Sequence, residues 1–173
     1  MKYIKVFVIV LCVVSCTPIY VNYDYEKRTD FSMYKTYNFY DDMKTGLTGL
    51  DEKRLISVLE TKLNSIGLSK SETPDFLIDI GSHELENNQN STVGVGLGGG
   101  RGGLGGGVSI GIPVGQSKVN REIIIEFVDD SKTGLFWQAK SESAYNPKAK
   151  PQQREVKLKA IIDKIMEKYP PKK

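Results

Sequence analysis

The chain has 173 residues and carries 24 Lys and Arg against 21 Asp and Glu, for a formal net charge of +3. That length suits one domain rather than two. With a single histidine, His83, and two cysteines, Cys12 and Cys16, the composition excludes a disulfide scaffold, a Cys/His zinc site and most histidine-based catalysis.

The first fifteen residues have the pattern of an export signal. Lys2 and Lys5 precede an almost unbroken apolar run over residues 6–14, which is the order of charged and apolar regions in a signal peptide. At ~1.5 Å per residue the run covers about half of a ~30 Å hydrocarbon core, so a permanent transmembrane helix is not expected. We predict that residues 1–15 are a signal peptide; a buried N-terminal helix or strand is the alternative.

The apolar run ends on Val13-Val14-Ser15-Cys16, which resembles the lipobox of bacterial lipoproteins. The motif requires a thiol because its thiolate is nucleophilic enough to take a diacylglyceryl group, and a small preceding residue lets the signal peptidase reach the bond. The resemblance implies cleavage of the Ser15–Cys16 bond and lipidation of Cys16, with residues 16–19 as a short tether. Two or three acyl chains on one residue would make the membrane anchor effectively permanent.

The residue after the cysteine, Thr17, is not acidic. Under the usual sorting rule for Gram-negative lipoproteins this implies transfer to the outer membrane, and the lack of an acidic run after Cys16 favours the periplasmic face. Loss of residues 1–15 removes two lysines and no acid, which lowers the net charge to +1. The basic balance therefore belongs to the precursor, and no nucleic-acid partner is expected.

Aromatic and β-branched residues predict strands over residues 20–25 and 29–40, the second with Tyr37 and Phe39 on one face. A helix is predicted over residues 50–66. Its apolar stripe is formed by Ile56, Leu59, Leu63 and Ile66, with Leu55 beside it. Thr48 and Asp51 resemble a capping box, and Gly67 with Leu68 predicts the helix end.

The chain then alternates between apolar and polar residues, which predicts a strand from Pro74 to about Leu85. A hairpin is predicted from strands at residues 122–128 and 135–141, joined by a turn at 129–134, with Leu135, Trp137 and Ala139 on one face. Pro151 begins a last helix. Its apolar face is formed by Leu158, Ile161, Ile162, Ile165 and Tyr169, and its solvated remainder includes Arg154, Lys157 and Asp163.

This order of elements predicts an α+β fold, in which a mainly antiparallel β-sheet has both helices packed on one face. Residues 20–173 would form a single domain, interrupted between strands by a glycine-rich insertion at about 94–115. Ten of the 17 glycines lie within residues 94–107.

Several blocks of sequence, in this order, resemble one known family. They are the lipobox, DFSMYKTY at 30–37, TPDFLI at 73–78, FVDDSKTGLFW at 127–137 and YPP at 169–171. The chain is similar over nearly its whole mature length to domain of unknown function 4136, a group of bacterial envelope lipoproteins. The resemblance implies an envelope location and a fold, but no reaction and no catalytic residues.

The glycine-rich segment formally contains G-x-G-x-x-G at Gly94–Gly99. That motif binds a dinucleotide only where a strand turns into a helix, and here more glycines follow, so nucleotide binding is not expected. Two interpretations remain open. The segment is either a flexible crossing between strands or a flat surface that contacts lipid or a partner strand through residues such as Val93, Leu97 and Ile110.

Several other residues are candidates for a catalytic or binding site. His83 shares a face with Asp79, which in principle orients a base, but a lone exposed or half-buried histidine is the simpler interpretation. Acidic pairs such as Asp41-Asp42 and Asp129-Asp130 lie where acids form turns and caps. Trp137 is expected in the core. The tyrosines between residues 20 and 40 suit either strand propensity or the lipid headgroup region.

The sequence thus favours an outer-membrane-anchored lipoprotein with a non-catalytic role in the envelope, either structural or partner-binding. The alternative is a periplasmic module that binds a small ligand or peptidoglycan, and an enzyme comes third. No cofactor and no metal is expected. The predicted partners are the membrane, through the lipid on Cys16, and an envelope protein.

Overall fold

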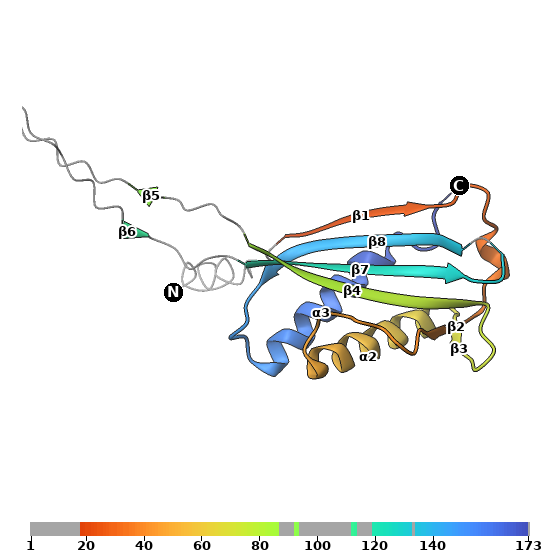
Figure 1. Ribbon diagram of the computed structural model, residues 1–173, viewed down its shortest axis with the longest axis horizontal. Coiled ribbons are helices and arrows are strands. Elements are labelled where there is room, and N and C mark those ends of the chain that lie inside the picture. The colour runs from red at the N-terminus through yellow and green to blue at the C-terminus, as the bar shows by residue number, and fades with distance from the viewer. Residues whose placement is uncertain (1–17, 87–91, 94–111, 114–118, 133, 173) are drawn as a thin grey trace, which may run out of the picture.

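The computed structural model describes residues 18–86, 92–93, 112–113, 119–132 and 134–172. A six-stranded sheet with the strand order β1-β8-β7-β4-β2-β3 forms the main body (Figure 1). The strands are β1 (Ile19–Tyr25), β2 (Thr36–Phe39), β3 (Ser69–Lys70), β4 (Phe76–Glu86), β7 (Val119–Asp129) and β8 (Gly134–Tyr145). The helices are η1 (Phe31–Met33), α2 (Gly49–Ser65) and α3 (Pro151–Met166), and β5 (Thr92–Val93) pairs with β6 (Ile112–Pro113) in a separate two-stranded sheet.

The predicted α+β class is confirmed. Strands β1, β8, β7 and β4 pair in antiparallel fashion, whereas β2 pairs in parallel with both β4 and β3. The parallel pairing of β2 with β4 follows from α2, which carries the chain back between the two strands. Both helices lie along the same face of the sheet (Figure 1).

The core lies between that face and the two helices. Every second residue is buried there from Phe76 to Ser82 of β4 and from Arg121 to Asp129 of β7, as the alternation of the sequence predicted. Four of the five residues predicted for the apolar face of α3 are confirmed and Met166 adds to it, whereas the fifth, Tyr169, is buried but lies beyond the end of the helix. The buried residues of these elements are Phe76, Ile78, Ile80, Ile123, Ile125, Phe127, Leu158, Ile161, Ile162, Ile165 and Met166. Complete burial of each large apolar side chain stabilises the fold by about 1.5–3 kcal/mol.

The buried stripe of α2 differs from the predicted one. Leu55, Leu59 and Leu63 are fully buried, but Ile56 is only partly buried and Ile66 is 38% exposed. The reason is that the helix ends at Ser65, which leaves Ile66 as its C-terminal cap. The predicted helix end itself is confirmed, because Gly67 has φ +90° and the amide of Leu68 donates to the carbonyl of Leu63 at 3.0 Å.

The second predicted strand is shorter than expected. Only residues 36–39 are extended in the sheet, and residues 31–33 form the short helix η1. Side chains compete with sheet pairing here, since Asp30 accepts a hydrogen bond from the amide of Ser32, and Asp75 accepts from the amides of Lys35 and Thr36.

A β-bulge changes the face of one hairpin residue. Phe127 lies opposite Trp137 and Val128 lies opposite Leu135, so that Phe136 is the extra residue of β8. Phe136 and Trp137 are consequently both fully buried, whereas Leu135 is 44% exposed. The prediction that Leu135 shares a face with Trp137 was wrong, and the prediction that Trp137 lies in the core is confirmed.

Aromatic rings fill the end of the core next to this bulge. Tyr34 stacks on Phe136 with ring centroids 4.2 Å apart, and Trp137 contacts Phe127 at 4.7 Å and Tyr169 at 5.3 Å. Tyr34 also donates from its hydroxyl to the carboxylate of Asp129 at 3.0 Å. Tyr169, which follows α3, is therefore part of the core.

Candidate functional site

Most of the candidate site residues predicted from the sequence either have structural roles or lie outside the residues that the structure describes. Ser15 and Cys16 lie outside the described residues, as does nearly all of the glycine-rich insertion. His83 is exposed on the sheet face opposite the helices, where it lies across from Glu122 of β7.

The acidic candidates near turns are bound within the fold. Asp129 is buried and accepts from Tyr34 and from the amide and hydroxyl of Ser131. Burial favours a higher pKa for Asp129, but the hydrogen bonds from Ser131 and Tyr34 outweigh it and lower the pKa below its ordinary value. Asp130 accepts from the hydroxyl of Tyr40. These carboxylates hold the β7–β8 turn and do not face a cavity.

The structure also shows a cleft that the sequence analysis did not find. It lies between the first half of α3 and the helix-facing side of β7 and β8, near the start of β1, and has a volume of about 630 Å³. We call it the Arg121 cleft. Its apolar wall is formed by Ile19, Ile123, Ala149, Val156, Leu158 and Ile161.

Arg121 supplies the buried charge of this cleft. The residue is only 8% exposed, its Nη2 donates to Oε1 of Glu84 at 2.5 Å, and its guanidinium lies 3.5 Å from the ring centroid of Tyr145. Its Nε is buried and has no hydrogen-bond partner among the described residues. Such a donor is costly to bury without an acceptor.

Arg154 forms the far end of the same cleft. Its Nε donates to the carbonyl of Ala149, its Nη2 to the carbonyl of Pro147, and its Nη1 to Oδ2 of Asp51. The loop between β8 and α3 is thereby held against the N-terminus of α2. The prediction that Arg154 belongs to the solvated side of α3 was wrong, since its charge is used inside the fold.

Asp51 is the partner on α2. Its side chain is 3% exposed and also accepts from Nη1 of Arg54 at 2.8 Å. Burial by itself favours a higher pKa for this carboxyl, but the hydrogen bonds from Arg154 and Arg54 outweigh it, so the pKa of Asp51 is lowered. The same pair raises the pKa of Arg154. Only half of the predicted capping box forms, because Thr48 accepts from the amide of Asp51 but Asp51 turns to the arginines.

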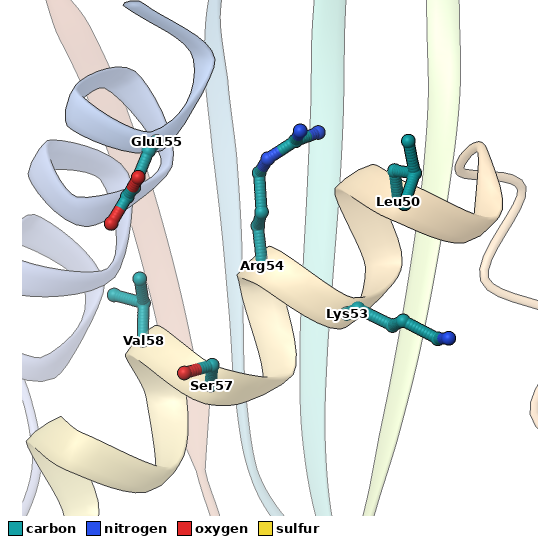
Figure 2. A pocket seen from close by; sticks show the side chains of 6 residues that line it. All are labelled: Leu50, Lys53, Arg54, Ser57, Val58 and Glu155. Atoms are coloured by element: carbon teal, nitrogen blue, oxygen red, sulfur yellow. The ribbon is translucent and has the colours of Figure 1, made fainter. Parts of the chain in front are cut away.

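A second hollow lies between the outer sides of α2 and α3 (Figure 2) and measures about 280 Å³. Five of its six lining residues come from α2, and Glu155 comes from α3; Lys53 extends away from α3. Arg54 is already bound to Asp51. With few apolar walls and no buried polar group aimed into it, this hollow has less of the character of a ligand site than the Arg121 cleft.

The described ranges contain no cluster of three or more His, Cys, Asp or Glu side chains placed to hold a metal ion. Over the same ranges, none of the helices has the length and apolar character needed to cross a bilayer.

The sequence did contain a signal for Arg121 that was missed. Arg121 stands in phase with Ile123, Ile125 and Phe127, at alternate positions on the buried side of β7. A charged residue in phase with a buried apolar series needs a partner or a ligand. Nothing local could have shown that Tyr145 and Glu84 surround it, because the sheet brings them together from distant segments.

Comparison with known proteins gives a family and a fold. The model of the family described as "Domain of unknown function (DUF4136)" matches residues 21–171. No curated protein matches the chain. Among solved structures, a PDZ domain protein from Parabacteroides distasonis is similar with a TM-score of 0.57 and 14% identity. That likeness covers 95% of this chain but only 39% of the other, and at such an identity it shows the fold alone.

Two crystal structures of PelC from Paraburkholderia phytofirmans, both dodecamers, are also similar. Their TM-scores are 0.49 and 0.46 at identities of 9% and 8%. Each likeness covers 86% of this chain, and 95% and 96% of the respective PelC chain.

Proposed function

The chain belongs to the DUF4136 family of domains of unknown function, and from that premise we propose that it is a lipid-anchored protein of the bacterial outer membrane whose domain acts by binding and not by catalysis. The observation that carries the proposal is the Val13-Val14-Ser15-Cys16 motif together with the position of β1. That strand begins at Ile19, three residues after Cys16.

The short distance between the anchor and the fold supports a place at the membrane surface. Three residues reach about 10 Å when fully extended, so a lipidated Cys16 would hold β1 next to the headgroups. Two tyrosines of β1 are exposed there, Tyr20 at 66% and Tyr23 at 43%. Tyrosine is enriched at membrane interfaces because it joins an apolar ring to a polar hydroxyl.

The bonding of the buried carboxylates supports a role in binding. Asp51 and Asp129 accept hydrogen bonds from arginine, tyrosine and serine side chains within the fold. A general base needs an accessible lone pair near a substrate. The carboxylates of Asp51 and Asp129 are instead engaged in hydrogen bonds that connect parts of the fold. The Arg121 cleft, mostly apolar with a few polar groups, has the composition of a binding site.

Replacement of Cys16 by alanine in the full chain tests the anchor. We expect the Cys16→Ala protein to stay as the uncut precursor and to lose the mass of the lipid, as measured by mass spectrometry of the membrane and soluble fractions. Cys12→Ala is the matched control, because it changes the other cysteine within the apolar run and should leave processing unchanged. An unchanged mass and unchanged fractionation of Cys16→Ala would refute the anchor.

A second candidate function is a periplasmic module that binds a small ligand or peptidoglycan. The Arg121 cleft favours it, since its volume of about 630 Å³ lies in the usual range of about 300–1,000 Å³ for small-molecule sites. Co-sedimentation of the protein with insoluble peptidoglycan tests whether it binds peptidoglycan. Binding that survives Arg121→Met would place any peptidoglycan contact outside the cleft.

A further inference from the structure

We propose that the Arg121 cleft binds a single-chain aliphatic carboxylate, a fatty acid, with its carboxylate at Arg121 and its chain between α3 and the sheet. The inference goes beyond the lipid anchor and does not depend on it, because it rests on residues of the folded domain. It assigns a class of ligand to the Arg121 cleft, the cavity between α3 and the sheet.

The walls of the cleft suit an aliphatic chain. Ile123 of β7 and Ile161 of α3 are buried residues of the core that also line the cleft. Val156 also lines the cleft and is 69% exposed. Small residues leave room between these walls, namely Ser143 and Ala149. Covering this apolar surface with a chain is favourable by about 25 cal/mol per Å².

The buried arginine suits an acidic headgroup. Arg121 is more than nine-tenths buried, yet its Nε has no acceptor among the described residues. Its Nη2 is bound to Glu84, whose side chain is 53% exposed, and its planar face rests on Tyr145. The guanidinium is thus held in one orientation. Its Nε has almost no accessible surface, so a carboxylate in the cleft would instead meet the part of Arg121 that lines it, through a charge-assisted hydrogen bond.

The charges around the cleft also favour an anion. Its lining includes Arg121 and Arg154, and its one carboxylate, Asp51, already accepts from Arg54 and Arg154. A neutral alcohol of the same length would gain the apolar contacts but not this attraction.

A single chain fits the cleft better than a phospholipid. One arginine matches a carboxylate, whereas a phosphodiester with a glycerol and two chains needs several donors and a larger apolar volume. Ile19, the first residue of β1, also lines the cleft. A ligand that partitions into membranes would therefore reach the cleft directly if the domain sits on a bilayer.

Photo-crosslinking of the full chain in phosphatidylcholine vesicles tests the inference. The probe is hexadecanoic acid carrying a diazirine near the end of its chain, and the labelled peptides are identified by mass spectrometry. We expect labelling on residues 143–149 of the β8 end and on residues 152–161 of α3. Excess unlabelled hexadecanoic acid should reduce this labelling about tenfold, and excess hexadecanol should not.

Three variants separate ligand recognition from folding. Arg121→Met should reduce the labelling about tenfold, while Lys53→Met, which removes an exposed cation of the second hollow, should leave it unchanged. Val156→Glu places a negative charge at the exposed side of the cleft without disturbing the core, and should also abolish labelling. Circular dichroism melting of each variant shows whether its domain is folded.

Several outcomes would overturn the proposal. Equal competition by hexadecanol would mean that the cleft is an apolar surface with no recognition of the carboxylate. Competition by phosphatidylglycerol but not by hexadecanoic acid would assign the cleft to a two-chain lipid. Full labelling of a folded Val156→Glu protein, or labels spread over the opposite face of the sheet, would place the ligand elsewhere. None of these results bears on Cys16, whose lipidation is measured by the mass of the protein.

Discussion

Arg154 at the start of α3 donates to Asp51 at the start of α2 with Nη1 and Oδ2 2.5 Å apart, across 103 residues of sequence. The other nitrogens of Arg154 donate to the carbonyls of Pro147 and Ala149. One side chain thus fixes the two helix N-termini to each other and positions the loop that closes one end of the Arg121 cleft.

Removal of the Asp51 carboxylate should be strongly destabilising. Asp51→Ala leaves two guanidinium groups, of Arg54 and Arg154, without their buried acceptor, and breaking a buried pair in this way costs about 3 kcal/mol or more. Urea unfolding followed by circular dichroism measures the change. Asp163→Ala is the matched control on α3, because its carboxylate is more exposed and pairs with Lys62 and Lys159 at the surface, where such pairs contribute at most about 1 kcal/mol. Equal losses in both variants would contradict the buried pairing.

Acid should destabilise the protein over a defined range. Burial opposes the ionised forms of Asp51 and Asp129, but their hydrogen bonds outweigh it and lower the pKa of both below the ordinary 3.8. A carboxyl with a lowered pKa stabilises the fold fully above its unfolded pKa and loses that contribution as the pH falls through its folded pKa. The free energy of unfolding should therefore decrease as the pH is lowered below about 4. Asp51→Asn should be less stable at pH 7 and have a shallower acid dependence; a curve parallel to that of the wild type would refute this.

Two tyrosines in one aromatic cluster should respond differently to loss of their hydroxyls. Tyr34 donates to Asp129, so Tyr34→Phe should cost about 1.5–3 kcal/mol, the range for a hydrogen bond to a charged group. The hydroxyl of Tyr169 is buried with no partner in the described part of the structure, so Tyr169→Phe should change the stability by less than about 0.5 kcal/mol or increase it. Both rings stay in place, and denaturant midpoints give the comparison. A large loss from Tyr169→Phe would mean that its hydroxyl is bound after all.

Glycine replacements should rank by backbone contact. Gly46 has φ +68°, and a Cβ there would lie 2.4 Å from the carbonyl oxygen of Ser82; with the strain of the left-handed backbone, Gly46→Ala should cost about 3 kcal/mol. Gly67 has φ +90° but open space around it, so Gly67→Ala should cost only about 1–2 kcal/mol. Gly81→Ala on β4, which has open space and no such backbone strain, is the control. Thermal melting that failed to rank Gly46→Ala as the least stable would contradict the close approach.

The elements that the sequence predicted well are those defined by local periodicity. The apolar face of α3, from Leu158 to Ile165, follows from spacing alone, as does the alternation of β4 and β7. The end of α2 at Gly67 was also predictable, because glycine is favoured at the left-handed position that closes a helix. In these segments the information lies within a few neighbouring residues.

What the sequence could not predict depends on contacts between distant segments. The bulge at Phe136 reverses the face of Leu135 through the pairing of β8 with β7. Arg154 was placed in solvent because Asp51, its partner, lies on another helix. The Arg121 cleft likewise needs β7, β8 and α3 together. Cleavage after Ser15 and lipidation of Cys16 stay predictions of the sequence.

The sheet order also sets when the protein can fold. β1 comes first in the described chain, yet within that part its neighbour in the sheet is β8, with Ile19 opposite Ser143. During synthesis β1 therefore has no strand to pair with until almost all of the domain has been made. Pairings this distant in sequence slow folding. Strand β1 should consequently stay unpaired through most of translation, and it is among the last of the described strands to be fixed in the sheet.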